Sequence, residues 1–267
     1  DDRAEMLGKI GVGDINDLFA DVPPHALLKE LVDLPLHMTE MEVEKNFNAF
    51  AAKNVAAGSV PFFVGAGAYK HHVPSSVDYQ IQRGEYLTAY TPYQPEISQG
   101  TLQTLYEFQT QVAQITGMDV ANASMYDGST GCGEAALMAR RVTKKKKILL
   151  SGNLHPHYID VVKSATKYTD DVVITNDPTV NNTESLLDQV DAETSCIIVQ
   201  NPDFFGNLND YTEFAAALQE QKILLIIVTT EIVALGAIKS PGEMGADIVV
   251  GEGQSIGNGL NYGGPYV

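Results

Sequence analysis

The sequence has few cysteines and no long apolar run. Its two cysteines, Cys132 and Cys196, are too few for a disulfide framework, so we expect both to be reduced inside a cell. The longest apolar run, Ile223–Val228, has the length of a strand, whereas a membrane-spanning helix needs about 18 to 20 apolar residues. Residues 1–6 lack the basic start and apolar core of a signal peptide. These absences predict a cytoplasmic protein.

Positive charge is scarce as well. Lys and Arg together number 17 against 34 Asp and Glu, which gives a formal net charge of −17 at pH 7. A surface this acidic repels nucleic-acid phosphates and anionic lipids, so we expect neither nucleic acid nor a membrane as a partner. Hydrophobic residues make up 44% of the 267 positions and charged residues 19%, as in a globular protein with a sizeable core.

The apolar pattern divides the chain into two segments. Residues 1–97 predict short helices joined by loops, with a capping box at Thr39 and Glu42 and an irregular aromatic stretch from residue 59 onward. From residue 98 a strongly amphipathic helix runs to about residue 117. Further strands are expected at 147–150, 172–175, 195–199, 223–228 and 248–250, with helices at 156–168, 183–190 and 211–221. This alternation predicts an α/β domain over residues 98–267, with a mostly parallel sheet covered by helices on both faces.

Small residues precede the helical run Ala135–Val142. Ser129, Thr130 and Gly131 lie in this stretch, where backbone amides and two hydroxyls at a helix N-terminus favour a phosphate group. The stretch lacks the lysine of a P-loop and the glycine spacing of a dinucleotide fingerprint. An ordinary turn with Ser or Thr as N-cap explains it equally well.

Two more loops follow predicted strands. His155 and His157 form an H-x-H pair without an obvious third ligand nearby, so we expect no metal there, and a role for His155 beside a bound ring stays open. Asn201 directly follows the strand 195–199. Because ligands gather at the carboxyl ends of parallel strands, the Ser129, His155 and Asn201 loops predict one shared crevice.

Several segments in a fixed order carry a family resemblance. They are Tyr90–Gly100, Met125–Thr130, Gln200–Pro202, Gly242–Glu243, Gly251–Ser255 and Gly263–Pro265. Together they resemble the P-protein of the glycine cleavage system, glycine dehydrogenase (decarboxylating), and more narrowly its N-terminal half, which many bacteria make as subunit 1. The resemblance implies a pyridoxal-phosphate enzyme of fold type I.

The resemblance also implies that the cofactor lysine lies on the other half, or on subunit 2. A Schiff-base lysine is expected after the strand 248–250, but Gln254 and Ser255 stand there and the last lysine is Lys239. Neither Gln nor Ser forms an imine with an aldehyde. We therefore expect no covalently bound cofactor on this chain, and activity only with subunit 2. The assembled enzyme would decarboxylate glycine and pass the aminomethyl group to the lipoyl arm of the H-protein.

The sequence departs from the family in two places. Subunit 1 continues past the Gly-Gly-Pro segment into a small C-terminal domain, whereas this sequence ends at Val267, so that domain is expected to be missing. Thr229–Ile232 stands where the family has a Thr-Asp-Pro-like turn that faces the cofactor ring. We therefore expect a degraded pocket, with Ser129, Thr130 and Gly131 as a relic phosphate cradle and His155 and Asn201 as relic ring-side positions.

One polar and aromatic stretch is expected to act in trans, because fold type I active sites lie at subunit interfaces. Its residues are Tyr93, Gln94, Glu96, Ser98 and Gln99. Pro92 and Pro95 lower the entropy of holding such a stretch in place, although the same residues could simply shape a surface turn. The alternative for the whole chain is a catalytically silent structural or regulatory partner. A self-sufficient aminotransferase-like enzyme is disfavoured by the missing lysine.

Overall fold

A computed structural model of the chain describes residues 2–87 and 91–259. Contacts divide the chain into two compact units, Asp1–Val55 and Ala56–Val267. The boundary expected after residue 97 lies inside the second unit and stays a prediction. Tyr90 and the segment Gly263–Pro265 of the family resemblance fall outside the described residues.

The first unit consists of short helices, as the sequence predicts. They are α1 (Asp2–Ile10), the 3-10 helix η1 (Ile15–Phe19) and α2 (Glu40–Ala51). The capping box before α2 is confirmed, since the backbone N–H and the hydroxyl of Thr39 donate to Glu42 Oε2 at 2.9 and 2.8 Å. None of the described residues of this unit is buried.

The second unit opens with three helices, α3 (Ser75–Ile81), α4 (Gly84–Leu87) and α5 (Gln99–Thr116). The predicted amphipathic helix is confirmed as α5. Gly117 ends it in the left-handed conformation with φ +73°, a conformation that glycine adopts without a Cβ penalty. The backbone of Gly242 anchors this end of α5, because its N–H donates to Thr116 O at 2.9 Å.

The predicted parallel sheet is confirmed. Its strands are β1 (Lys147–Leu150), β2 (Val172–Thr175), β3 (Thr194–Gln200), β4 (Leu224–Thr229) and β5 (Ile248–Gly251). They pair in the order β2-β1-β3-β4-β5, and every pairing is parallel. All seven residues of β3 are buried, because it lies at the centre of the sheet.

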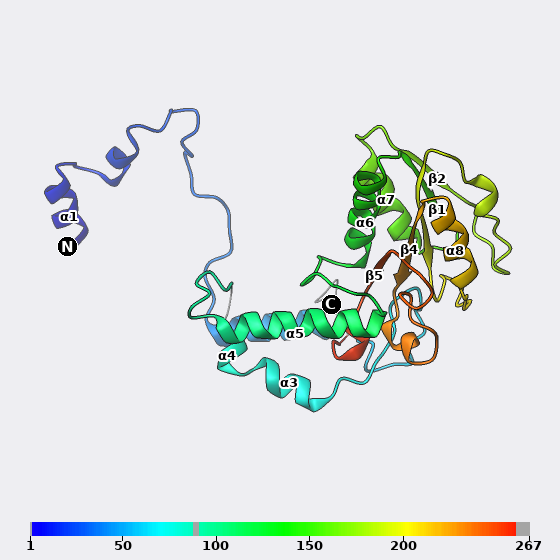
Figure 1. The fold of residues 1–267 in the computed structure, drawn as a ribbon. Helices are drawn as coiled ribbons and strands as arrows, with labels where there is room; N and C mark the ends of the chain where they lie inside the picture. Colours follow the sequence, from blue (N-terminus) through cyan, green and yellow to red (C-terminus); the bar gives the residue numbers. More distant parts are fainter. Residues whose placement is uncertain (1, 88–90, 260–267) are drawn as a thin grey trace. The chain divides into compact units, whose positions relative to one another are not determined.

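Helices cover both faces of this sheet (Figure 1). On one face, α6 (Gly128–Thr143) and α7 (Pro156–Thr166) pack around a core that includes Ile148, Ile198 and Val228. On the other face, α8 (Thr212–Glu220) closes a second core around Ile197 and Ile227. Successive residues of each strand therefore serve opposite cores, which explains why the strands read as continuous apolar runs.

Two helix predictions need correction. The segment 183–190 is not an α-helix, and contains only the 3-10 turn η2 (Leu187–Gln189). Glu184 instead accepts hydrogen bonds from the Ser151 hydroxyl at 2.6 Å and the Gly152 N–H at 2.8 Å, so tertiary contacts to β1 override the local pattern. Helix α6 begins at Gly128 rather than near Ala135, which puts the presumed loop inside its first turns.

Two further 3-10 helices, η3 (Ile232–Gly236) and η4 (Gln254–Ile256), follow β4 and β5. Across residues 2–87 and 91–259, no helix is long and apolar enough to cross a membrane.

Candidate functional site

The carboxyl edge of the sheet gathers the loops that the sequence analysis singled out. The Asn153 side chain, after β1, donates to Asp203 Oδ2, after β3, at 2.7 Å. The ring of His155 lies edge-on to that of Phe204, with 5.3 Å between centroids. The hydroxyl of Tyr158 reaches Glu252, after β5, at 2.5 Å. The loop after β1 and the first turn of the helix that follows it thus contact the segments after β3 and β5 directly.

The N-terminus of α6 lies at this edge and is capped by an aspartate. Asp127 Oδ1 accepts from the Thr130 N–H at 2.6 Å and from the Ser129 hydroxyl at 2.8 Å. Burial opposes ionisation of Asp127, but these hydrogen bonds outweigh it and lower the pKa of the carboxyl. Ser129, Thr130 and Gly131 therefore lie in the first turn of the helix, and the N-cap is Asp127 rather than Ser or Thr.

A second carboxylate lies beside the same helix end. A Cβ at position 128 would clash with the Tyr158 hydroxyl oxygen and lie 2.9 Å from Glu252 Oε1, so the absence of a side chain at Gly128 lets both groups approach. The buried Tyr158 donates to that oxygen, and the Gln254 side-chain amide donates to the other. Burial, followed by the charge of Glu252, raises the pKa of Tyr158, so the phenol stays protonated as the donor.

Both ring nitrogens of His155 form hydrogen bonds within the chain. Its Nδ1 accepts from the His157 N–H at 3.1 Å, so Nε2 carries the proton and donates to Ala66 O at 2.9 Å. Burial lowers the pKa of His155, which favours this neutral form. His157 lies 5.0 Å away, ring centroid to centroid. Within the described ranges, no three His, Cys, Asp or Glu residues are grouped so that they could hold a metal ion.

We call residues 65–74, drawn in cyan in Figure 1, the strap, because they contact two of the strand-end loops. A tight turn with positive φ at Gly65, Ala66 and Gly67 presents the Ala66 carbonyl to His155. His71 Nε2 lies 3.5 Å from Glu231 Oε2 after β4. Directly after the strap, Val77 in α3 lies against Gly257 after β5, where a Cβ would be 3.3 Å from the valine Cγ2.

Asn201 is 1% exposed and serves its own loop. Its side-chain amide donates to Asn209 O at 2.9 Å, and its Oδ1 accepts from the Asn209 N–H at 3.1 Å. Both ends of the side chain are therefore engaged inside the fold.

The stretch Tyr93–Gln99 forms a mostly exposed turn that leads into α5, whose first residue is Gln99. Tyr93 is 80% exposed, and the N–H groups of Ile97 and Ser98 both donate to Gln94 O at 3.1 and 3.0 Å. The Ser98 side chain makes no hydrogen bond to the helix that it precedes, so capping does not account for it. The fold thus presents this polar stretch outward on a fixed turn.

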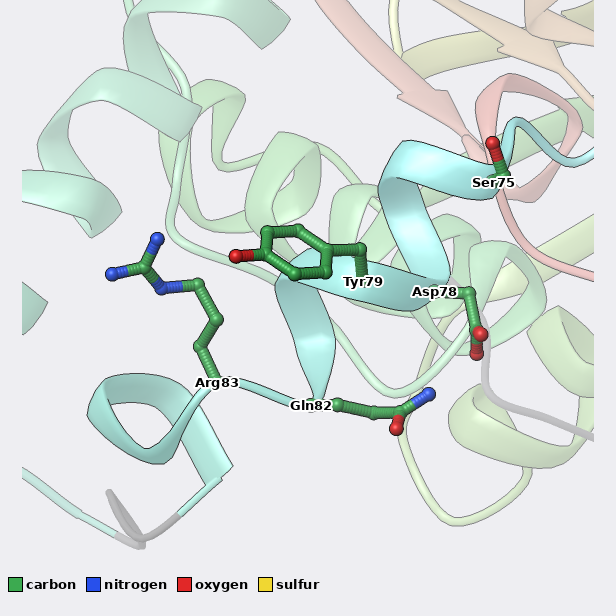
Figure 2. Close-up of a pocket in the computed structure, with 5 residues that line it drawn as sticks. All are labelled: Ser75, Asp78, Tyr79, Gln82 and Arg83. Carbon is green, nitrogen blue, oxygen red and sulfur yellow. The ribbon is translucent and has the colours of Figure 1, made fainter.

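A hollow of about 350 Å³ lies beside α3 (Figure 2). Its lining residues are Ser75, Asp78, Tyr79, Gln82 and Arg83. Figure 2 shows that they do not converge: Tyr79 and Arg83 project to one side of the helix, while Asp78 and Gln82 project to the other. Arg83 is already paired with Glu85 at 2.5 Å. The hollow therefore lacks the convergent polar groups of a ligand site.

Sequence reasoning missed His71, Tyr158 and Glu252 as members of the edge cluster. Glu252 stands in a quoted family segment, but its importance depends on contacts across 94 residues that no local pattern reveals. His71 lies in the aromatic stretch, where its neighbour His72 gives the same local signal yet is exposed.

Comparisons with known proteins agree with the sequence resemblance. A family model described as "Glycine cleavage system P-protein" matches residues 1–267. The chain is 61% identical to "Probable glycine dehydrogenase (decarboxylating) subunit 1" of Methylocella silvestris and 60% identical to the same subunit of Beijerinckia indica subsp. indica. Both matches cover 100% of this chain and 60% of the relative.

A solved structure agrees as well. The crystal structure of glycine decarboxylase (P-protein) of the glycine cleavage system, in inhibitor-bound form, matches with a TM-score of 0.87 and 40% identity. The match covers 98% of this chain and 59% of the P-protein chain in that crystal structure. The expected α/β architecture of fold type I is thereby confirmed, over about three fifths of the length of these proteins. The chain belongs to the glycine cleavage system P-protein family.

Proposed function

We propose that this chain is the subunit 1 part of glycine dehydrogenase (decarboxylating), and that it works with a lysine-bearing subunit 2. The proposed reaction removes carbon dioxide from glycine and transfers the aminomethyl group to the lipoyl arm of the H-protein. Pyridoxal phosphate, held by the partner, supplies the electron sink. The relatives named as subunit 1 support this assignment, and their bacterial origin supports a cytoplasmic location.

The observation that carries the proposal is the exposed turn Tyr93–Gln99. Its hydroxyl, amide and carboxylate groups face outward from a turn held by backbone hydrogen bonds to Gln94 O. Such groups can bind and orient a small amino acid at a subunit interface without reorganising. In this proposal Tyr93, Gln94, Glu96, Ser98 and Gln99 complete the wall of the partner's active site.

The loop after β5 supports the same division of labour. Gln254 and Ser255 occupy the region in which the cofactor lysine is expected, and Ser255 is buried at 7% exposure. Neither side chain can attack an aldehyde as an amine does. The lysine must therefore come from the partner in this proposal.

Reconstitution tests the proposal. Exchange of bicarbonate with the glycine carboxyl group is measured for this chain alone, for the lysine-bearing subunit alone, and for the mixture. We expect exchange only in the mixture. Exchange by this chain alone would contradict the proposal, and full exchange by the partner alone would make this chain a catalytically silent structural or regulatory subunit.

A further inference from the structure

The carboxyl edge of this chain's own sheet does not fit a phosphorylated ring. The N-terminus of a helix favours an anion because its backbone amides and dipole are positive. At α6 the Thr130 N–H is already bound by the Asp127 carboxylate at 2.6 Å. The side chain of Glu252 lies beside the first residue of the helix, with Cγ and Oε1 2.8 and 2.9 Å from where a Cβ at Gly128 would be. A phosphate at the same place would meet a carboxylate.

The carboxylate is held there by specific contacts. The Tyr158 hydroxyl, itself 4% exposed, donates to Glu252 Oε1 at 2.5 Å, and the Gln254 amide donates to Oε2. Hydrogen bonds to a charged acceptor are the stronger kind. The half-buried side chain of Glu252 is therefore held in place at both of its oxygens.

Another carboxylate at this edge of the sheet, that of Glu231, is also covered by a side chain of the same chain. Glu231 follows β4, in the turn where the family resemblance places a ring-facing carboxylate, and its Oε2 lies 3.5 Å from His71 Nε2 of the strap. Both side chains are largely covered, at 18% and 20% exposure. The imidazole of His71 thus contacts the carboxylate of Glu231.

We propose that side chains of this chain itself occupy the relic cofactor pocket. Glu252 lies at the N-terminus of α6, and His71 lies against Glu231. The two side chains close the pocket to phosphorylated ligands and tie the strap to the sheet edge. The strap is held a second time by the hydrogen bond from His155 to Ala66. This inference concerns the chain's own pocket and does not depend on the activity proposed above.

Melting temperature in inorganic phosphate tests the first part. We expect phosphate at about 10 mM to leave the parent chain unchanged and to raise the melting temperature of Glu252→Ala by roughly 3 °C, because one of the two carboxylates that repel an anion at this helix end is removed. Glu193→Ala removes the same charge from an exposed position before β3, at the opposite edge of the sheet, and should not respond. Equal stabilisation of the parent, or no response of Glu252→Ala, overturns the proposal.

Direct titration covers the case in which Glu252→Ala does not fold. Pyridoxamine phosphate, which has no aldehyde to react with surface lysines, should keep an unchanged absorbance spectrum when it is mixed with the parent chain at up to about 1 mM. Saturable binding by the parent at micromolar concentrations contradicts a filled pocket. The measurement needs no variant and no partner subunit.

Hydrogen exchange of the strap tests the second part. His71→Ala should speed amide exchange in residues 65–72 by about tenfold or more, since one anchor of the strap is lost. The matched control is His72→Ala, which truncates the exposed neighbour and should leave exchange unchanged. Equal effects of the two variants, or no effect of His71→Ala, would show that His71 does not anchor the strap. The same comparison in the reconstituted enzyme shows whether the partner alters it.

Discussion

Gly242 lies against Gly117, the residue that ends α5. A Cβ at position 242 would be 3.0 Å from the Gly117 Cα and closer still to its carbonyl group. This backbone contact fixes the end of α5, and α5 in turn carries the turn that begins at Tyr93. The position of the proposed trans-acting wall therefore depends on a glycine far from it in sequence.

Substitution of that glycine should destabilise the fold. We expect Gly242→Ala to lower the free energy of unfolding by about 1–3 kcal/mol, because the new methyl group meets backbone that cannot move aside. Urea denaturation measures the change. Gly100→Ala is the control, since nothing lies within 4 Å of a Cβ there and alanine favours the helix. A neutral Gly242→Ala would mean that the contact is looser than described.

The proposed wall should contribute to activity and not to assembly. Tyr93→Phe or Gln94→Ala should lower glycine–bicarbonate exchange of the reconstituted enzyme on the order of ten- to a hundred-fold, the equivalent of one hydrogen bond to a charged group. Sedimentation should show unchanged assembly. Tyr168→Phe, at a 91% exposed tyrosine outside the turn, serves as control. Full activity of both variants would leave the turn as scaffold.

The Asp127 cap of α6 should make the free energy of unfolding decrease at acidic pH. The pKa of Asp127 is lowered in the fold, so its contribution is complete above the unfolded pKa of about 4 and is lost as pH falls through the folded pKa. Asp127→Ala should cost about 0.5–2 kcal/mol at neutral pH. Asp127→Asn keeps a capping oxygen but should lose the pH dependence. Denaturation curves from pH 7 to pH 3 would reveal either result, and parallel curves for parent and Asn variant would refute the assignment.

Tyr158 should make the free energy of unfolding decrease at alkaline pH. Burial and the charge of Glu252 raise its pKa in the fold, so the stabilisation is complete below the unfolded pKa of about 10 and declines as pH rises further. Tyr158→Phe removes the donor to Glu252 and should cost about 1.5–3 kcal/mol at neutral pH. The loss above pH 10 should be shallower in this variant than in the parent. Tyr168→Phe again provides the comparison, and identical alkaline curves for parent and Tyr158→Phe would argue against the pair.

Both cysteines should resist thiol reagents in the folded chain. Cys132 and Cys196 are 0% exposed, and burial raises the pKa of Cys132 to about 12. Because the thiolate is the reactive form, labelling should require unfolding. A colorimetric thiol assay with and without urea measures this. Rapid reaction of either thiol in native buffer would contradict the described packing.

Local patterns predicted the sheet well because each strand is a continuous apolar run with helices between. All five strands lie within a residue of the predicted bounds, since burial on both faces leaves an unambiguous signal. The start of α6 could not be placed, because Gly128, Ser129 and Thr130 favour loops in isolation. Only the Asp127 cap, together with packing against β5, makes them helical.

The contents of the edge cluster were beyond local reasoning for a different reason. The family resemblance predicted Asn201 as a ring-side group, and the fold uses that side chain to bind Asn209. The expected role of Asn201 beside a cofactor ring stays a prediction, and both polar ends of its side chain are already bound within the loop. Which carboxylate meets which donor is decided by distant segments, as in the pair of Tyr158 and Glu252.

The strap also imposes an order on folding. It is synthesised before any strand of the sheet, yet the partner of Ala66 is 89 residues further along the chain and Glu231 follows later still. Contacts of such long range close large loops and form slowly. During synthesis the strap cannot complete its contacts until Glu231, which follows β4, has emerged from the ribosome. Its full docking therefore follows the synthesis of β4, and protection of residues 65–72 from proteolysis would appear after protection of β1 and β3.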